Sequence, residues 1–203
     1  MRLLIAIPTL ENISYRFVEC LLALEKKLTR DGIDFEIKFH GGTLVYLARD
    51  TLTLEAINGK FTHVLWLDAD MIFTDELLDD LMFSKKPFVS AIAHSRRPPH
   101  ASCLFTSLKP PLRFQEYPAN TFEVEACGFA GVLIETQILA EVQVKYHSCF
   151  FPMLRYGEDV AFCIRAKELG YKIYAEPGAR MGHIGQKIVY PEDYKKYLDE
   201  IHR

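Results

Sequence analysis

The sequence predicts an α/β protein with a mostly parallel central sheet and helices on both of its faces. Short, continuous apolar runs indicate buried strands, and the stretches between them carry apolar residues at helical spacing. Such strand–helix alternation is typical of a parallel sheet whose two faces are covered. A chain of 203 residues suits one domain, or one with a small extension. We therefore expect a single domain over residues 1–203.

The first part of the chain, about residues 1–94, carries the clearest alternation. The expected strands are 2–8, 35–39, 63–67 and 88–93. Three helices are expected between them, carrying Phe17, Leu21, Leu24 and Leu28, then Leu47, Thr51, Leu54 and Asn58, then Leu77, Leu78 and Leu81. Asp31-Gly32 ends the first helix, Gly59 ends the second, and Thr74 is a good N-cap for the third. We interpret this part as a nucleotide-binding half.

The second part, about residues 95–203, has a different pattern. Residues 95–117 are rich in proline and arginine, which predicts a loop with room for a short hairpin. Strands are expected at 122–126, 131–135 and 171–175. Helices are expected at 158–169, ended by Gly170, and from near Pro191. We interpret this part as a substrate-facing half of the same sheet, with a smaller antiparallel element.

Composition excludes some function classes. The formal net charge of -3, from 24 basic and 27 acidic residues, argues against general nucleic-acid binding. No apolar run approaches the ~20 residues that cross a bilayer, and we interpret the N-terminal MRLLIAIPTL as a first strand rather than a signal peptide. The 5 cysteines are odd in number and lack paired spacing, with Cys20, Cys127 and Cys163 in apolar surroundings. This pattern favours a reducing, cytoplasmic setting.

The apolar stretch HVLWLDADMIF, residues 63–73, holds two acids in its middle. An unpaired buried carboxylate costs several kcal/mol, so Asp68 and Asp70 need a compensating partner. Ligands of an open parallel sheet bind beyond the carboxyl ends of its strands, where these two residues are expected. Both carboxylates could face one Mg²⁺ or Mn²⁺ there. The alternative is that one aspartate caps the following turn while the other is solvated.

Three further groups are candidates for the same crevice. Glu158-Asp159 opens a predicted helix, where acids often only offset the helix dipole, but Asp159 could also act as a general base. His183 lies between Gly182 and Gly185 just past a strand, so its loop could swing toward a metal, although a lone histidine is more often structural. The basic loop 95–100 follows another strand. Its Arg96 or Arg97 could contact the acceptor or the diphosphate, whereas the alternative is a solvated loop stiffened by prolines.

The order of these motifs resembles the GT-A-fold glycosyltransferases, close to the family-two type. The resemblance runs from about Ile5 to His183 and covers most of the chain. Its motifs are Ile-Pro-Thr at 7–9, Leu-Ala-Arg-Asp at 47–50, Leu-Asp-Ala-Asp-Met at 67–71, Gly-Phe-Ala-Gly at 128–131, Gly-Glu-Asp-Val-Ala-Phe-Cys-Ile-Arg at 157–165 and a closing Gly-His at 182–183. The sequence departs from the family at 39–42, where Phe-His-Gly-Gly stands in place of a base-reading acid.

The resemblance implies metal-dependent transfer of a sugar from a nucleoside-diphosphate sugar to an acceptor hydroxyl, with inversion. The acceptor would be a glycan, or a lipid-linked or protein-linked group. The nucleotide-sugar site implied by the family is Pro8, Thr9, Arg49, Asp68, Ala69, Asp70, Gly128 and Gly131. For Arg49 the alternative is a salt bridge on the helix surface. Asp159 would be the base and Glu158 would orient the acceptor, while Asp68, Asp70 and His183 would hold Mn²⁺ or Mg²⁺.

Three other classes remain as alternatives. A haloacid-dehalogenase-like phosphatase also places Asp-x-Asp after a buried strand, but on its first strand, and with Thr or Val two residues after the second Asp, where this chain has Ile72. A nucleotidyltransferase of related fold would need a glycine-rich loop after the first strand. A non-catalytic sugar-binding module would share the fold and the ligand but would not turn over a nucleotide sugar.

Overall fold

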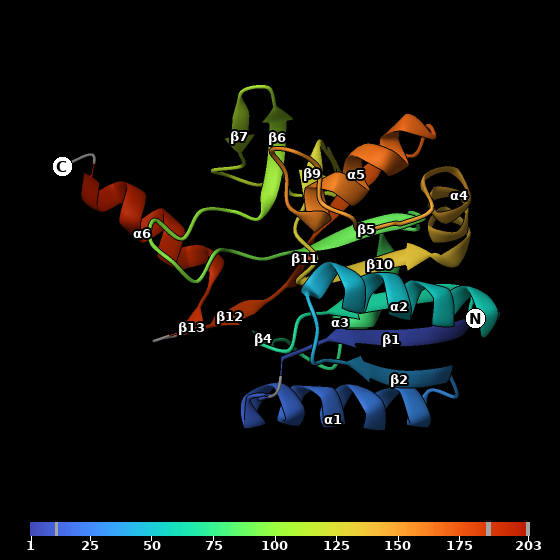
Figure 1. The fold of residues 1–203 in the computed structure, drawn as a ribbon. Helices are drawn as coiled ribbons and strands as arrows, with labels where there is room; N and C mark the ends of the chain where they lie inside the picture. The colour runs from blue at the N-terminus through green and yellow to red at the C-terminus, as the bar shows by residue number, and fades with distance from the viewer. Residues whose placement is uncertain (11, 186–187, 202–203) are drawn as a thin grey trace.

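A seven-stranded sheet forms the centre of the protein, as the computed structural model shows for residues 1–10, 12–185 and 188–201 (Figure 1). Its strands, in spatial order, are β2 (Asp34–His40), β1 (Arg2–Pro8), β3 (His63–Leu67), β10 (Gly131–Glu135), β5 (Phe88–Ile92), β11 (Ile173–Arg180) and β8 (Phe122–Val124). Five strands run in one direction, and only β8 and β10 run in the other. The expectation of a mostly parallel sheet is confirmed.

Helices cover both faces of this sheet, because successive residues of the buried strands point to opposite sides. Leu3, Ile5 and Ile7 of β1 pack with α1 (Tyr15–Arg30) and α3 (Leu77–Phe83). Leu4 and Ala6 belong to a second cluster. The helices that contribute to that cluster are α2 (Val45–Asn58), α4 (Thr136–Tyr146) and α5 (Glu158–Glu168). The single-domain core is thus one sheet with an apolar layer on each side.

Three details of the helices differ from the sequence-based expectation. In α2, Leu47 and Leu54 are 43% and 44% exposed, and the buried side is formed instead by Ala48, Arg49, Leu52, Thr53 and Ala56. Small residues allow this helix to lie close to the sheet. In α3, the helix begins at Leu77 with Glu76 at the N-cap, and Thr74 only accepts a turn hydrogen bond from the Leu77 amide. Helix α4 was not expected.

Two small antiparallel sheets extend the second part of the chain. One contains β7 (Pro111–Arg113), β6 (Leu104–Leu108) and β9 (Ala126–Cys127), so the hairpin left open at 95–117 exists. The other contains β13 (Ile188–Val189), β12 (Gly182–Ile184) and β4 (Met71–Ile72), and α6 (Pro191–Ile201) follows it. His183 therefore lies within strand β12 and not on the mobile loop that was expected.

Strand β10 connects the two parts of the chain. It comes from the second part but lies between β3 and β5 of the first, with Gly131 paired to Leu67. This register places the Ala130 carbonyl 3.2 Å from the Asp68 amide, which donates to it. The segment before β10 therefore meets the segment after β3 at one edge of the sheet. No helix in the described part of the chain is both long and apolar enough to cross a membrane.

Candidate functional site

A cleft of about 640 Å³ lies at the carboxyl ends of β1 and β3. Arg96 of the basic loop 95–100 lines it, together with eight other residues proposed from sequence: Pro8, Thr9, Arg49, Asp68, Ala69, Asp70, Glu158 and Asp159. These eight arrive from β1, from α2, from the turn after β3 and from the first turn of α5. The sheet thus brings together residues that are up to 151 positions apart in the chain.

Arg49 is the centre of the charges in this cleft. It is 1% exposed, and its Nη2 lies 2.8 Å from Asp68 Oδ1 and 3.6 Å from Asp159 Oδ1. Its Nε lies 3.9 Å from Glu158 Oε1. The alternative of a salt bridge on the helix surface is therefore wrong, because the guanidinium is inside the protein and faces three carboxylates.

Aromatic rings enclose the same guanidinium. The Arg49 Cζ atom lies 5.2 Å from the ring centre of Phe129, 5.7 Å from Trp66 and 5.8 Å from Phe150. Burial acts against the charge of Arg49, but the neighbouring carboxylates outweigh it and raise the pKa of the guanidinium. Stacking on aromatic faces further favours a cation. Arg49 is thus a fixed positive charge beneath the acidic residues.

Asp159 has the most strongly shifted carboxylate of the cleft. Burial raises its pKa to about 7, with Glu158 and Asp68 adding to the effect and Arg49 opposing it. Its Oδ2 accepts a 3.3 Å hydrogen bond from the Phe129 amide, whereas its Oδ1 is buried beside the Arg49 guanidinium, 3.6 Å from Nη2, and has no hydrogen bond among the described residues. A carboxyl group that lines a cleft and has a pKa near neutrality can exchange a proton with a ligand.

Asp70 and His183 form a second charged group at the cleft. His183 Nε2 lies 3.1 Å from Asp70 Oδ2, and His183 Nδ1 lies 2.9 Å from the His94 carbonyl oxygen. Arg96 Nη1 donates to the same Asp70 oxygen at 2.7 Å. Burial acts against ionisation of Asp70, but His183 and Arg96 outweigh it and lower the pKa of the Asp70 carboxyl.

This pair fits part of a divalent-metal site. The His94 carbonyl orients the imidazole so that Nε2 faces Asp70, which is how ligating histidines are commonly held. Asp68 instead directs Oδ1 to Arg49. Over residues 1–10, 12–185 and 188–201, no three or more His, Cys, Asp or Glu side chains are grouped to hold a metal. Asp70 and His183 would therefore need substrate or water oxygens to complete a shell, as Mg²⁺ often has.

Comparison with solved structures relates this arrangement to known proteins. Over 95% of this chain and 92% of the other, A197 from STIV superposes with a TM-score of 0.67 at 19% identity. The catalytic domain of Drosophila β1,4-galactosyltransferase 7, in complex with xylobiose, gives a TM-score of 0.56 at 11% identity over 86% and 64%. GalNAc-T7 with UDP, GalNAc and Mn²⁺ gives 0.59 at 10% identity over 98% and 47%. The fold is that of a GT-A glycosyltransferase domain.

Sequence comparison also finds a similar protein. A 75-residue segment is 36% identical to the mannan polymerase complex subunit MNN9 of Candida albicans, and it covers 36% of this chain. The segment spans about a fifth (20%) of that relative's length. A scan of protein-family models finds no match.

Two of the expected nucleotide-sugar residues do not line the cleft of this GT-A domain. At Gly131, the space for a Cβ is occupied by Met181, whose Sδ would be 2.1 Å away. At Gly128, a Cβ would lie 3.3 Å from the Cys103 Cβ and 3.7 Å from Asp159 Oδ2. Gly131 is thus required for close packing of the sheet, and Gly128 lets the segment after β9 lie beside Asp159.

One important residue was missed from the sequence. Asp50 Oδ1 accepts hydrogen bonds of 2.9 Å from the amides of Cys149 and Phe150, and its Oδ2 accepts one of 2.5 Å from the Ser148 hydroxyl. This anchors the segment that places the Phe150 ring against Arg49. The only available signal was its position directly after Arg49, and that position does not reveal a partner about 100 residues away.

Proposed function

We propose that this chain is a glycosyltransferase that moves a sugar from a nucleoside-diphosphate sugar to an acceptor hydroxyl, with inversion at the anomeric carbon. The observation that carries the proposal is the position of Asp159. This residue has a pKa near neutrality and lies in one cleft with Asp68 and Asp70. The GT-A fold supports the proposal, as do two of the similar structures: the galactosyltransferase domain, and GalNAc-T7, which was solved with UDP and Mn²⁺.

The donor would occupy the β1–β3 side of the cleft. Pro8 and Thr9 line this side, where a nucleoside can lie against the ends of the strands. Asp70 and His183 are the residues that would hold Mn²⁺ or Mg²⁺, and a divalent cation there would neutralise charge on the leaving diphosphate. Arg96, which is 49% exposed and reaches Asp70, can turn its remaining donors to the same phosphates.

Asp159 would act on the acceptor. As the acceptor oxygen attacks the anomeric carbon, the Asp159 carboxylate takes its proton, and the bond from that carbon to the diphosphate oxygen breaks on the opposite face. Positive charge develops on the sugar ring during this exchange. A base with a pKa of about 7 is suited to proton transfer at neutral pH. Glu158, directly before it, would orient the acceptor, and Arg49 would keep Asp68 and both acids of α5 in place.

A screen of nucleotide sugars by thermal shift, with Mn²⁺ and with a chelator, tests donor binding. A ligand that binds the native state raises the melting temperature. Release of free nucleoside diphosphate with a mixture of acceptors then tests transfer. We expect Asp159→Asn to keep donor binding and to lower transfer about 10²-fold or more.

Stabilisation by a donor without any turnover would instead identify a non-catalytic sugar-binding module. Full transfer by Asp159→Asn at neutral pH would refute the assignment of the base.

A further inference from the structure

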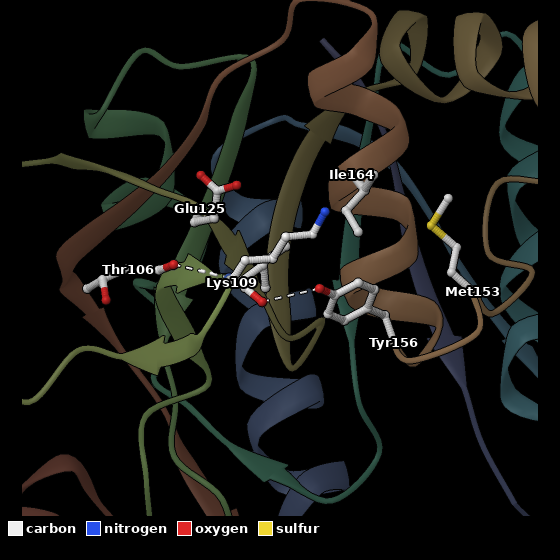
Figure 2. A pocket seen from close by; sticks show the side chains of 8 residues that line it. Thr106, Lys109, Glu125, Met153, Tyr156 and Ile164 are labelled. Atoms are coloured by element: carbon white, nitrogen blue, oxygen red, sulfur yellow. Dashed lines mark hydrogen bonds between the residues drawn. The ribbon is translucent and has the colours of Figure 1, made fainter.

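A second pocket, of about 570 Å³, lies between the β6–β7 hairpin, the turn at 153–156 and α5 (Figure 2). We call it the hairpin pocket. Thr106 and Lys109 line it from the hairpin, Met153 and Tyr156 from the turn, Ile164 from α5, and Glu125 from the segment before β9. None of these residues has a part in the reaction proposed above.

The walls of the hairpin pocket are linked to one another. The turn is closed by two hydrogen bonds, from the Met153 amide to the Tyr156 carbonyl at 3.1 Å and from the Tyr156 amide to the Met153 carbonyl at 2.9 Å. The Tyr156 hydroxyl then donates to the Leu108 carbonyl at 3.2 Å, a contact drawn in Figure 2. The turn is thus tied to the hairpin, and the pocket exists before any ligand arrives.

The hairpin pocket is connected to Asp159 by two short segments of the chain. Ile164 is five residues after Asp159 on α5, which is about 7.5 Å along the helix axis. Glu125 is three residues before Gly128, about 10 Å along an extended chain, and the Gly128 position faces Asp159 Oδ2. The Gly128 amide also donates to the Cys103 carbonyl at 2.9 Å, just before β6 begins. Helix α5 and the segment 125–128 thus each contain a residue beside or at Asp159 and a residue that lines the hairpin pocket.

The chemistry of the lining suits a sugar. Tyr156, Met153 and Ile164 offer apolar surface, and a tyrosine whose hydroxyl is already bonded presents mainly its ring. Thr106 and Lys109 offer polar groups, and no acidic side chain in the described ranges pairs with the Lys109 ammonium. Glu125 adds a negative charge, which is paired with Lys167. The lining thus combines apolar and aromatic surface with a hydroxyl and one ammonium that is unpaired among the described residues, which suits a ligand rich in hydroxyls better than a hydrocarbon chain.

We propose that the hairpin pocket binds the sugar units of the acceptor that lie beyond the hydroxyl that reacts. The acceptor is then an oligosaccharide and not a monosaccharide. This inference rests on the proposed function, since the position of Asp159 gives the pocket its role.

Saturation-transfer NMR on the full chain, with neutral oligosaccharides of two to five units and the matching monosaccharides as probes, tests the inference. Thr106→Trp should fill the pocket from an exposed position, and Thr29→Trp, on an exposed site of α1, is its matched control. Lys109→Ala, with Lys26→Ala on α1 as control, tests the pocket without added bulk. Nucleoside diphosphate with Mn²⁺ is titrated into each variant in parallel.

We expect an oligosaccharide to bind the parent at least 10-fold more tightly than its monosaccharide, and Thr106→Trp and Lys109→Ala to weaken that binding. Both controls should bind as the parent does, and all variants should bind the nucleotide equally. Equal oligosaccharide binding by Thr106→Trp and Lys109→Ala, or no preference for oligosaccharides, overturns the inference while nucleotide binding stands. If these variants weaken oligosaccharide binding but the protein binds no nucleotide, the sugar-binding role of the hairpin pocket is supported and the proposed transferase function is refuted.

Discussion

The raised pKa of Asp159 makes the stability of the protein depend on pH. Asp159 has a pKa of about 7 in the folded protein against 3.8 for an unperturbed aspartate, a difference of about 3 units. Between about pH 4 and pH 7, Asp159 is therefore protonated in the folded state and ionised in the unfolded state. Stability contributed by this group is largest at low pH and is lost as the pH rises from about 4 to about 7.

The magnitude follows from the same shift. A pKa difference of one unit corresponds to about 1.36 kcal/mol, so the full effect is about 4 kcal/mol, of which about 2–3 kcal/mol is lost between pH 5 and pH 8. Asparagine carries no charge at either pH and keeps the shape of the side chain. We therefore expect the free energy of unfolding of Asp159→Asn, relative to the parent, to rise by about 2–3 kcal/mol between pH 5 and pH 8.

Urea denaturation of both proteins at pH 5, 6, 7 and 8 measures this difference. Asp34→Asn on β2, where the aspartate side chain is 68% exposed, controls for the loss of a carboxylate as such. A difference between Asp159→Asn and the parent that stays constant within about 0.5 kcal/mol over this range would refute the reasoning. Asp159 would then be ionised like a solvent-exposed acid, and the argument for it as a base with a matched pKa would fail.

Three further changes test other parts of the structure. Arg49→Met should lower the free energy of unfolding at pH 7 by about 3–5 kcal/mol, because three carboxylates lose their buried cation; a loss below about 1 kcal/mol in urea would contradict this role. Gly131→Ala should cost about 1–3 kcal/mol, since its Cβ would meet Met181 Sδ at 2.1 Å, and adding Met181→Ala should recover part of that loss; additive effects would mean that the two positions do not touch. Asp70→Ala should abolish Mn²⁺-dependent binding of a nucleoside diphosphate in calorimetry, and unchanged binding would exclude Asp70 as a ligand.

Local patterns in the sequence predicted most of the central sheet and the place of its acids. The run at 63–67 is apolar without alternation, which predicts a strand that is buried on both faces. Asp68 and Asp70 follow this strand directly, so they were expected at the edge of the sheet where it ends. The buried face of α2 could not be read in the same way. Leu47 and Leu54 point to solvent. The charge of Arg49 is stable inside the protein because Phe129, Phe150 and three acids from elsewhere in the chain surround it.

The metal-binding hypothesis shows the same limit. Glycines on either side of His183 suggested a free loop, yet the residue is held in β12 by pairing with Met71 of β4. Strand β4 has only two residues, too few to leave a periodic pattern in the sequence. Its partner is more than a hundred residues away, so only the assembled fold reveals that the histidine and Asp70 are neighbours.

The central place of β10 has a consequence for synthesis of the chain. When the first 94 residues have left the ribosome, β3 and β5 are present, but the strand that separates them has not been made. Both strands then expose open edges and apolar faces of the kind that pair with other chains. The nascent chain is therefore most prone to aggregation until residue 135 has emerged. Stalling translation just before that point should increase its capture by a holdase chaperone.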